Sequence, residues 1–248
     1  MNAPTTPPRT AAGWAAVSYA LLFVLAVLAN FLALGSVLEP GDAPGTAAAL
    51  VEHETSLRLG AVAFLAVFLL DVLIAWALLV LLRAVQPDLA LLAAWFRLTY
   101  TVLLGASLVA LFVALELVET PGASDSSVLL ALQSFDFLWV VGLSAFGVHL
   151  VLVGLLLLRA TGAPRPLVWL LVVAGTAYAA DTVAHLVLSD YEAYADLMLA
   201  VVAVPSVVAE LWFTVWLALV ATGRRPAPSA RGTGDYAERT TSSRSLTV

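Results

Sequence analysis

The sequence predicts an all-α fold, a polytopic membrane protein built as a six-transmembrane-helix bundle. The chain has 248 residues, of which 62% are hydrophobic and 11% are charged, whereas a soluble domain has about 25% charged residues. Six apolar stretches are long enough to cross the hydrocarbon core, which takes roughly 20 residues of helix. Strands of a membrane barrel would instead show short segments of alternating hydropathy. The predicted spans are residues 14–38, 57–82, 91–115, 137–158, 167–188 and 198–222.

The segments that flank the spans divide the chain into three regions. We expect residues 1–13 to be a cytoplasmic N-terminal segment, because the apolar run that follows is longer than the roughly 7–15 residues of a signal peptide. Residues 14–223 are expected to form the six-span membrane domain. Residues 224–248 are rich in Arg, Ser, Thr, Pro and Gly and have few apolar side chains. Such a segment cannot bury enough surface to fold, so we expect a disordered cytoplasmic tail.

The arginines set the expected orientation in the membrane. Cytoplasmic loops retain positive charge, and all the arginines except Arg58 and Arg97 fall on one side of the six-span arrangement. We therefore expect a multi-pass protein of the cell membrane with both termini in the cytoplasm. The loops on the opposite side carry the acidic residues Glu39, Asp42, Glu52, Glu54, Glu119, Asp125, Asp190, Glu192 and Asp196.

The composition excludes several kinds of chemistry. The chain has no cysteine, so it has no disulfide, thiolate metal ligand or thiol nucleophile. All its basic residues are arginine, which excludes a lysine Schiff base or a lysine general base. The net charge of −6 and the single short basic tail argue against nucleic acid as a partner. The partner that remains is the lipid bilayer, together with any small ligand or ion.

The fifth predicted span carries Asp181 and His185, which are four residues apart and so share one helix face. Tyr178 adds a polar tip three residues before Asp181. Charged groups in the hydrocarbon cost roughly 2.5–3.5 kcal/mol, so this face must point into the bundle. A carboxylate and an imidazole can hydrogen-bond to each other, relay a proton, hold a ligand, or bind a metal. The pattern leaves these alternatives open.

Three further ionisable residues lie in other spans. Glu210 lies in the middle of the sixth, five residues after Pro205, which removes a backbone donor. It acts either as a functional carboxylate or as an inter-helix salt bridge or hydrogen bond. Asp71 has no charged neighbour in its own helix and needs a partner across the bundle. Arg97 either extends to the headgroups or faces inward and pairs with Asp71 or Glu210.

His149, in the fourth span, is close to Gly142 and Gly147, which allow a neighbouring helix to approach. At about 1.5 Å of rise per residue, the six ionisable residues lie at different depths, with Arg97 nearest the cytoplasm. We expect them to face inward and at least one carboxylate to contact Arg97. We also expect a cavity among the third, fourth, fifth and sixth spans that opens outward and closes near Arg97. Its wall would include Phe135, Trp139 and Tyr178, and Asp136 and Glu116 would continue it to the outer surface.

Short motifs are distributed from the third span to the end of the sixth. They are WFR at 95–97, FGVHL at 146–150, GAPR at 162–165, AGTAYAAD at 174–181, ELW at 210–212 and WL at 216–217. With these motifs the chain resembles the bacterial membrane-protein family called domain of unknown function 4386, over about residues 14–223. The resemblance implies a helical integral membrane protein and no activity. It places Arg97, His149, Asp181 and Glu210 at family-like positions.

These observations support three hypotheses about function. The leading one is a non-enzymatic membrane protein, without a cofactor, whose inner polar cluster binds or transports a small ligand, ion or proton. Its candidate site residues are Asp71, Arg97, His149, Tyr178, Asp181, His185 and Glu210. The first alternative is a membrane-embedded hydrolase that holds zinc with His149, Asp181, His185 and Glu210, since three ligands and a water suffice. The second is a structural or partner-binding membrane subunit.

Overall fold

The structure is a computed structural model that describes residues 6–35, 37–39 and 41–231. Its regular elements are helices, and six of those in the described part are long and apolar enough to cross a membrane. The predicted fold class is therefore confirmed. The six are α1 (Pro8–Ala33), α3 (Glu54–Leu82), α4 (Pro87–Glu119), α5 (Asp125–Arg159), α6 (Arg165–Val187) and α7 (Ala195–Ala221). Two shorter elements connect them, α2 (Ala43–Glu52) and the 3-10 helix η1 (Tyr191–Tyr194).

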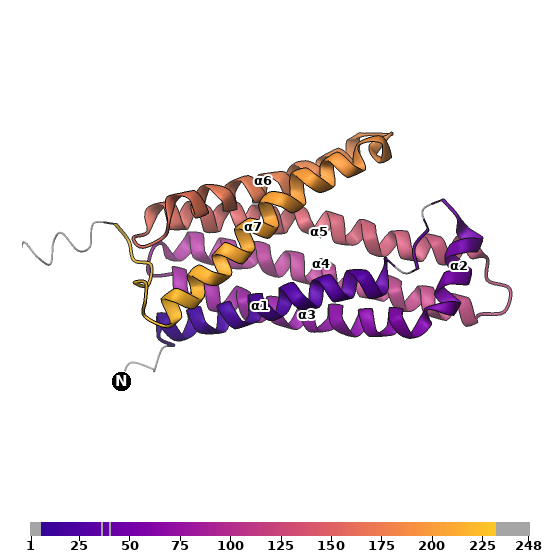
Figure 1. Cartoon of the computed structure of the whole chain (residues 1–248), viewed down its shortest axis with the longest axis horizontal. Coiled ribbons are helices and arrows are strands. Elements are labelled where there is room, and N and C mark those ends of the chain that lie inside the picture. The colour runs from indigo at the N-terminus through magenta and orange to yellow at the C-terminus, as the bar shows by residue number, and fades with distance from the viewer. Residues whose placement is uncertain (1–5, 36, 40, 232–248) are drawn as a thin grey trace, which may run out of the picture.

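The six long helices form a closed ring. Each packs against the next one along the chain, and α7 returns to pack against α1. The start of α1 and the end of α7 therefore lie at the same end of the bundle (Figure 1). We call this the arginine end, because Arg9, Arg83, Arg159 and Arg165 lie at the helix ends there. The opposite end, where α2 lies, we call the acidic end.

Local sequence explains where several helices begin. Proline occupies the first turn of α1, α2, α4 and α6, where its missing N–H would have no partner within the helix. Helix α2 also has an N-cap, since the Asp42 carboxylate accepts a hydrogen bond from Gly45 N at 3.0 Å. In the same way, Ser124 caps α5 by accepting from Ser127 N at 3.3 Å.

Helix α1 ends at Ala33, before the predicted residue 38, and helical structure extends well beyond the predicted spans in three places. Helix α1 begins at Pro8 instead of Trp14. Helix α2 lies in a segment expected to be only a loop. Helices α4 and α5 continue through most of the expected loop 116–136 and leave only residues 120–124 between them. The reason is that hydropathy locates the part of a helix inside hydrocarbon, whereas backbone hydrogen bonding continues into the polar surroundings beyond it.

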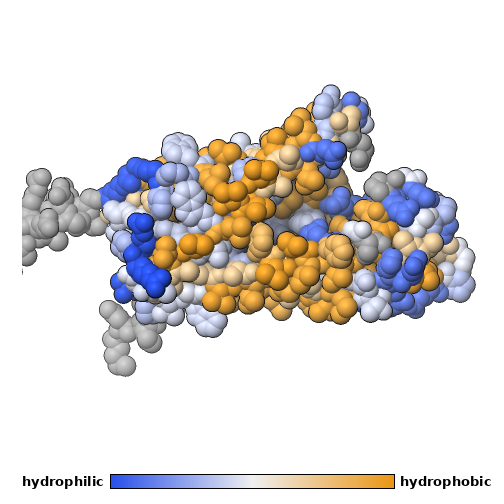
Figure 2. Space-filling view, in the orientation of Figure 1, coloured by the Kyte–Doolittle hydropathy of each residue, from blue (hydrophilic) through white to orange (hydrophobic). Residues whose placement is uncertain are grey.

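The helices of the ring pack together at the arginine end and separate toward the acidic end. In Figure 1, α7 lies beside α1 at the arginine end and then crosses away from it to join α6, so that α6 and α7 diverge from the other helices. The middle of the bundle carries a broad apolar surface between two polar ends (Figure 2). That surface matches a position across a bilayer.

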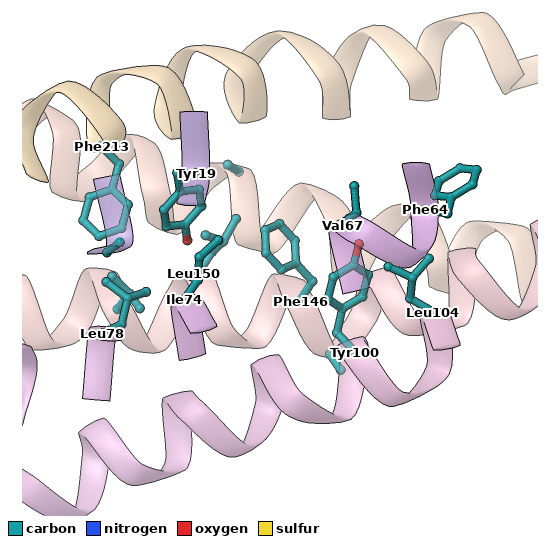
Figure 3. Close-up of a cluster of buried hydrophobic side chains, with 14 of the residues drawn as sticks. Tyr19, Phe64, Val67, Ile74, Leu78, Tyr100, Leu104, Phe146, Leu150 and Phe213 are labelled. Carbon is teal, nitrogen blue, oxygen red and sulfur yellow. The ribbon is translucent and has the colours of Figure 1, made fainter. Parts of the chain in front are cut away.

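A row of buried side chains fills the ring along its axis. Tyr19, Phe64, Phe213 and Leu104 are among the largest that are fully buried, and Figure 3 shows them with Tyr19 projecting from α1 into the bundle. Trp216 is also buried, and its Nε1 donates to Gly162 O at 3.3 Å. The packing of Tyr19, Phe213 and Trp216 closes the interior toward the arginine end.

The first residues of the expected tail lie against the turn between α5 and α6. Thr161 N donates to Ser229 O at 3.0 Å, and Arg231 N donates to Arg159 O at 3.2 Å. The Arg231 side chain also donates to Ala160 O at 3.1 Å. Residues 232–248 lie outside the described part of the chain, so disorder of the tail stays a prediction.

Candidate functional site

A buried ion pair joins α3 and α4 in the middle of the bundle. Arg97 Nη2 donates to Asp71 Oδ1 at 2.5 Å, and the two side chains are 0% and 1% exposed. The expectation that at least one carboxylate contacts Arg97 is thereby confirmed. Arg97 faces the interior of the bundle, because its side chain is fully buried against Asp71.

Two further helices complete the surroundings of the guanidinium. From α1, the Tyr19 hydroxyl accepts a hydrogen bond from Arg97 Nη1 at 2.5 Å. From α5, His149 Nε2 lies 3.3 Å from the same Nη1, while His149 Nδ1 lies 2.8 Å from the backbone oxygen of Ala93. A guanidinium only donates and a carbonyl only accepts, so Nδ1 carries the proton and Nε2 accepts. His149 is thus a buried positioning group for Arg97.

Above this ion pair lies a partly enclosed cavity of about 880 Å³. Asp71 and Arg97 line its floor, and it extends toward the acidic end as far as Gly35 and Tyr191. Helices α1, α5, α6 and α7 form its walls. Figure 2 shows the hollow between α1 and α7, with polar residues at its base and apolar residues on its rims.

The wall contributed by α6 and α7 brings Tyr178 and Glu210 together. Tyr178 is the donor to Glu210 Oε1, with a separation of 3.5 Å between the two oxygens. No basic side chain in the described part of the chain lies within 4.0 Å of the Glu210 carboxylate. Glu210 is thus a half-buried carboxyl group on the cavity surface without an ion-pair partner among these residues.

Closer to the mouth, Asp181 and His185 share one face of α6, as their spacing predicted. His185 Nδ1 lies 4.0 Å from Asp181 Oδ2, which is too long for a hydrogen bond. The Tyr191 hydroxyl of η1 instead donates to Asp181 Oδ1 at 2.7 Å, and its ring lies against the His185 ring with centroids 3.4 Å apart. These three residues line the cavity as a second group, separate from the floor.

Several buried polar atoms that face or surround the cavity have no hydrogen-bond partner among the residues the structure describes. They are Asp71 Oδ2, Arg97 Nε, Trp139 Nε1, His185 Nδ1 and Ser206 Oγ. An unpaired buried polar group costs about 1–3 kcal/mol. All five residues line the cavity, but these atoms are themselves buried, so a ligand or water in the cavity contacts them only when neighbouring side chains shift.

The structure corrects the expected cavity wall in three respects. Phe135 packs against Phe64 and Trp139 and does not line the cavity. Glu116 is exposed on α4 and does not line it either. Helix α1, the first span, also forms part of the wall, whereas only the third to sixth spans were expected to form it. The reason is that α7 packs against α1, and the cavity opens where these two helices separate toward the acidic end.

The structure does not gather the four residues proposed as zinc ligands. His149 is held by Arg97 and Ala93 O, Asp181 and His185 lie near the mouth, and Glu210 contacts Tyr178. Across the described residues, no group of three or more His, Asp or Glu side chains could hold one metal ion. The geometry therefore does not fit the hydrolase alternative, which needs three convergent ligands.

Sequence reasoning missed three residues of the site. Tyr19 lies in the first span, for which no site residue was predicted, although a tyrosine hydroxyl inside an apolar helix needs a polar partner. Tyr100 lines the cavity one helical turn from Arg97, and Ser206 lines it one turn before Glu210. Tyr100 is three residues from Arg97 and Ser206 is four residues from Glu210, so helical spacing could have predicted that these two share a face with the ionisable groups.

The fold and the cavity define a class of protein, the polytopic membrane proteins with a ligand-sized cavity that ends on a buried ion pair. The family follows from the sequence. A profile described as domain of unknown function (DUF4386) matches residues 14–221, so the chain belongs to this family. Comparisons with curated proteins and with solved structures gave no significant match.

Proposed function

We propose that this protein is a non-enzymatic membrane protein that binds a small ligand in the cavity above the Arg97–Asp71 pair. The observation that carries the proposal is the cavity itself. Its volume of about 880 Å³ lies within the roughly 300–1,000 Å³ of small-molecule sites. Asp71 and Arg97 border its floor, and the buried atoms Asp71 Oδ2 and Arg97 Nε lack hydrogen-bond partners in the described chain. A purely structural role for the ion pair would require neither the cavity nor the unpaired atoms.

Transport of the ligand is the finer form of this proposal. The cavity is open toward the acidic end, whereas Tyr19, Phe213 and Trp216 pack beneath it toward the arginine end. Binding requires only this arrangement. Transport requires a second state in which the packed end opens, and Pro205 inside α7 supplies a place where that helix can bend.

The orientation belongs to the same proposal. Both ends of the described chain lie at the arginine end of the bundle (Figure 1), and arginine-rich ends face the cytoplasm. In the cell membrane, the termini would then be cytoplasmic and the cavity would open to the outside. The ligand would reach it from the outer aqueous phase or from the outer part of the bilayer.

Filling the cavity tests whether it holds a ligand. Ala203 and Val204 are neighbours on α7, but Ala203 lines the cavity and Val204 is 65% exposed on the lipid-facing side. Native mass spectrometry of protein released from its own membrane should show an added small mass on the wild-type chain. Ala203→Trp should remove it because the indole fills the cavity, and Val204→Trp should retain it.

The matched pair makes the result decisive. A bound mass that persists in Ala203→Trp lies somewhere other than the cavity and contradicts the proposal. The absence of any bound mass from the wild-type chain also counts against it. Unchanged elution of both variants as monodisperse protein checks that the bundle still folds.

A further inference from the structure

The charged groups that line the cavity are predominantly acidic. Among the described residues, Asp71, Asp136, Asp181 and Glu210 line it, with Arg97 as the one arginine. Asp71 already neutralises Arg97 through the ion pair at 2.5 Å. Glu210 has no basic side chain within 4.0 Å among the described residues, and a carboxylate at bilayer depth is costly without a counter-charge. The charge distribution therefore favours a ligand that carries positive charge.

Aromatic rings stand beside these carboxyl groups. Phe146 packs edge-on against Tyr178 with ring centroids 5.4 Å apart and is tilted against Tyr100 at 5.1 Å. All three rings line the cavity together with Trp139. The Arg97 guanidinium already lies 5.3 Å from the Phe146 centroid. Aromatic faces with a nearby carboxylate are the surroundings that recognise ammonium groups, so the cavity suits an amine or a quaternary ammonium.

The rim of the cavity is apolar and faces the bilayer. Val27 and Phe31 on α1 are 57% and 71% exposed, and Leu199 on α7 is 66% exposed. All three line the cavity, and Figure 2 shows apolar residues on both sides of the hollow. Since α1 and α7 are spanning helices, this opening meets acyl chains. A ligand seated across it has an apolar part at the rim and a polar part at the base.

We propose that the ligand is an amphiphile with a cationic headgroup, which enters sideways from the lipid between α1 and α7. Its ammonium group is held near Glu210 against the rings of Tyr178 and Phe146. Its apolar chain lies along the opening between the two helices. This inference names the ligand class for the binding function proposed above and rests on it.

Protection of an introduced thiol tests the ligand class. The chain has no cysteine, so Ala203→Cys places one thiol on the cavity wall. In phosphatidylcholine vesicles, the neutral reagent methyl methanethiosulfonate should modify it, and Ala209→Cys, at a fully buried position outside the cavity, should react far more slowly. Decyltrimethylammonium at ten times its dissociation constant should slow modification of Ala203→Cys about tenfold by occupancy.

Two related compounds separate the headgroup from the chain. Tetramethylammonium has the cation without the apolar chain and should protect much less at the same concentration. Decyl sulfate has the chain with an anionic headgroup and should also protect less. Adding Glu210→Gln, which removes the charge and keeps the shape, should weaken protection by decyltrimethylammonium about tenfold, as expected for the loss of about 1.4 kcal/mol. Labelling of Thr10→Cys, at the arginine end, should not respond to any of the three compounds.

The outcomes distinguish this inference from the function on which it rests. Protection by decyl sulfate equal to or stronger than that by decyltrimethylammonium overturns the cationic class but leaves a ligand cavity in place. Protection that is unaffected by Glu210→Gln overturns the assigned headgroup site. Failure of all three compounds to protect a reactive Ala203→Cys overturns the inference. If Ala203→Cys reacts as slowly as Ala209→Cys, the cavity is not accessible and both proposals fail.

Discussion

Arg97 and Asp71, from adjacent helices α4 and α3, meet in a fully buried ion pair at 2.5 Å. Tyr19 from α1 and His149 from α5 contact the same guanidinium. One cation therefore joins four of the six spanning helices. It also forms the floor of the cavity, so stability of the ring and the shape of the site depend on the same contacts.

Removing one partner of this pair should destabilise the bundle strongly. In Asp71→Asn, Arg97 remains buried without its counter-charge, a change that costs about 3–5 kcal/mol in buried pairs. We expect a large drop in the temperature at which detergent-solubilised protein loses its monodisperse peak. The double variant Asp71→Leu with Arg97→Met should recover much of the loss, because no buried charge remains.

Arg58→Gln is the matched control for the ion pair. Arg58 contacts Glu54 and Glu119 at the acidic end, where its side chain is 51% exposed. Such exposed pairs contribute about 0–1 kcal/mol, so this variant should unfold close to the wild-type temperature. A drop as large as that of Asp71→Asn would contradict the assigned importance of burial.

The protonated nitrogen of His149 is set by its two neighbours. Arg97 donates to Nε2 and Ala93 O accepts from Nδ1, so the Nδ1–H tautomer is required. Nitrogen-15 NMR of histidine-labelled protein should show this tautomer for the signal that disappears in His149→Gln. Observation of the Nε2–H form would mean that Arg97 does not donate to this ring.

Close contact between α5 and α6 depends on two glycines. A methyl group at Gly147 would clash with the backbone oxygen of Gly175 and would lie 3.1 Å from Tyr178 Cβ. Gly147→Ala should therefore force the helices apart, shift Tyr178 and cost about 1–3 kcal/mol. Thermal unfolding in detergent measures the loss. Gly13→Ala is the control, because its methyl group would meet only Ala221 Cβ at 3.6 Å, and equal destabilisation there would refute the explanation.

The orientation proposed for the protein predicts which ends are accessible from outside the cell. Ser126 is exposed at the acidic end and Thr10 at the arginine end. A membrane-impermeant maleimide added to intact cells should label Ser126→Cys, and it should label Thr10→Cys only after the membrane is permeabilised. The reverse pattern would place the termini and the arginine end outside.

Sequence alone determined the membrane class, the six spans and the identity of most polar residues in the site. These inferences succeeded because the hydrocarbon core demands long apolar helices, and because ionisable residues such as Asp71, Arg97 and Glu210 stand out against them. The matching family profile adds the family but no activity. The start of α1 at Pro8 and the extension of α4 and α5 beyond the predicted spans were not predicted, since polar surroundings do not end a helix.

Only the tertiary structure decided which polar residues meet. Helix periodicity places Asp181 and His185 on one face, yet it cannot show that the Tyr191 hydroxyl, and not His185, donates a hydrogen bond to Asp181. Helix periodicity also cannot choose between Asp71 and Glu210 as the ion-pair partner of Arg97. Nor can it show that the Tyr19 hydroxyl of α1 accepts a hydrogen bond from Arg97. Contacts within one helix follow from spacing along the chain. Contacts between helices depend on the rotation and neighbours of each helix in the ring, which packing across the whole bundle determines.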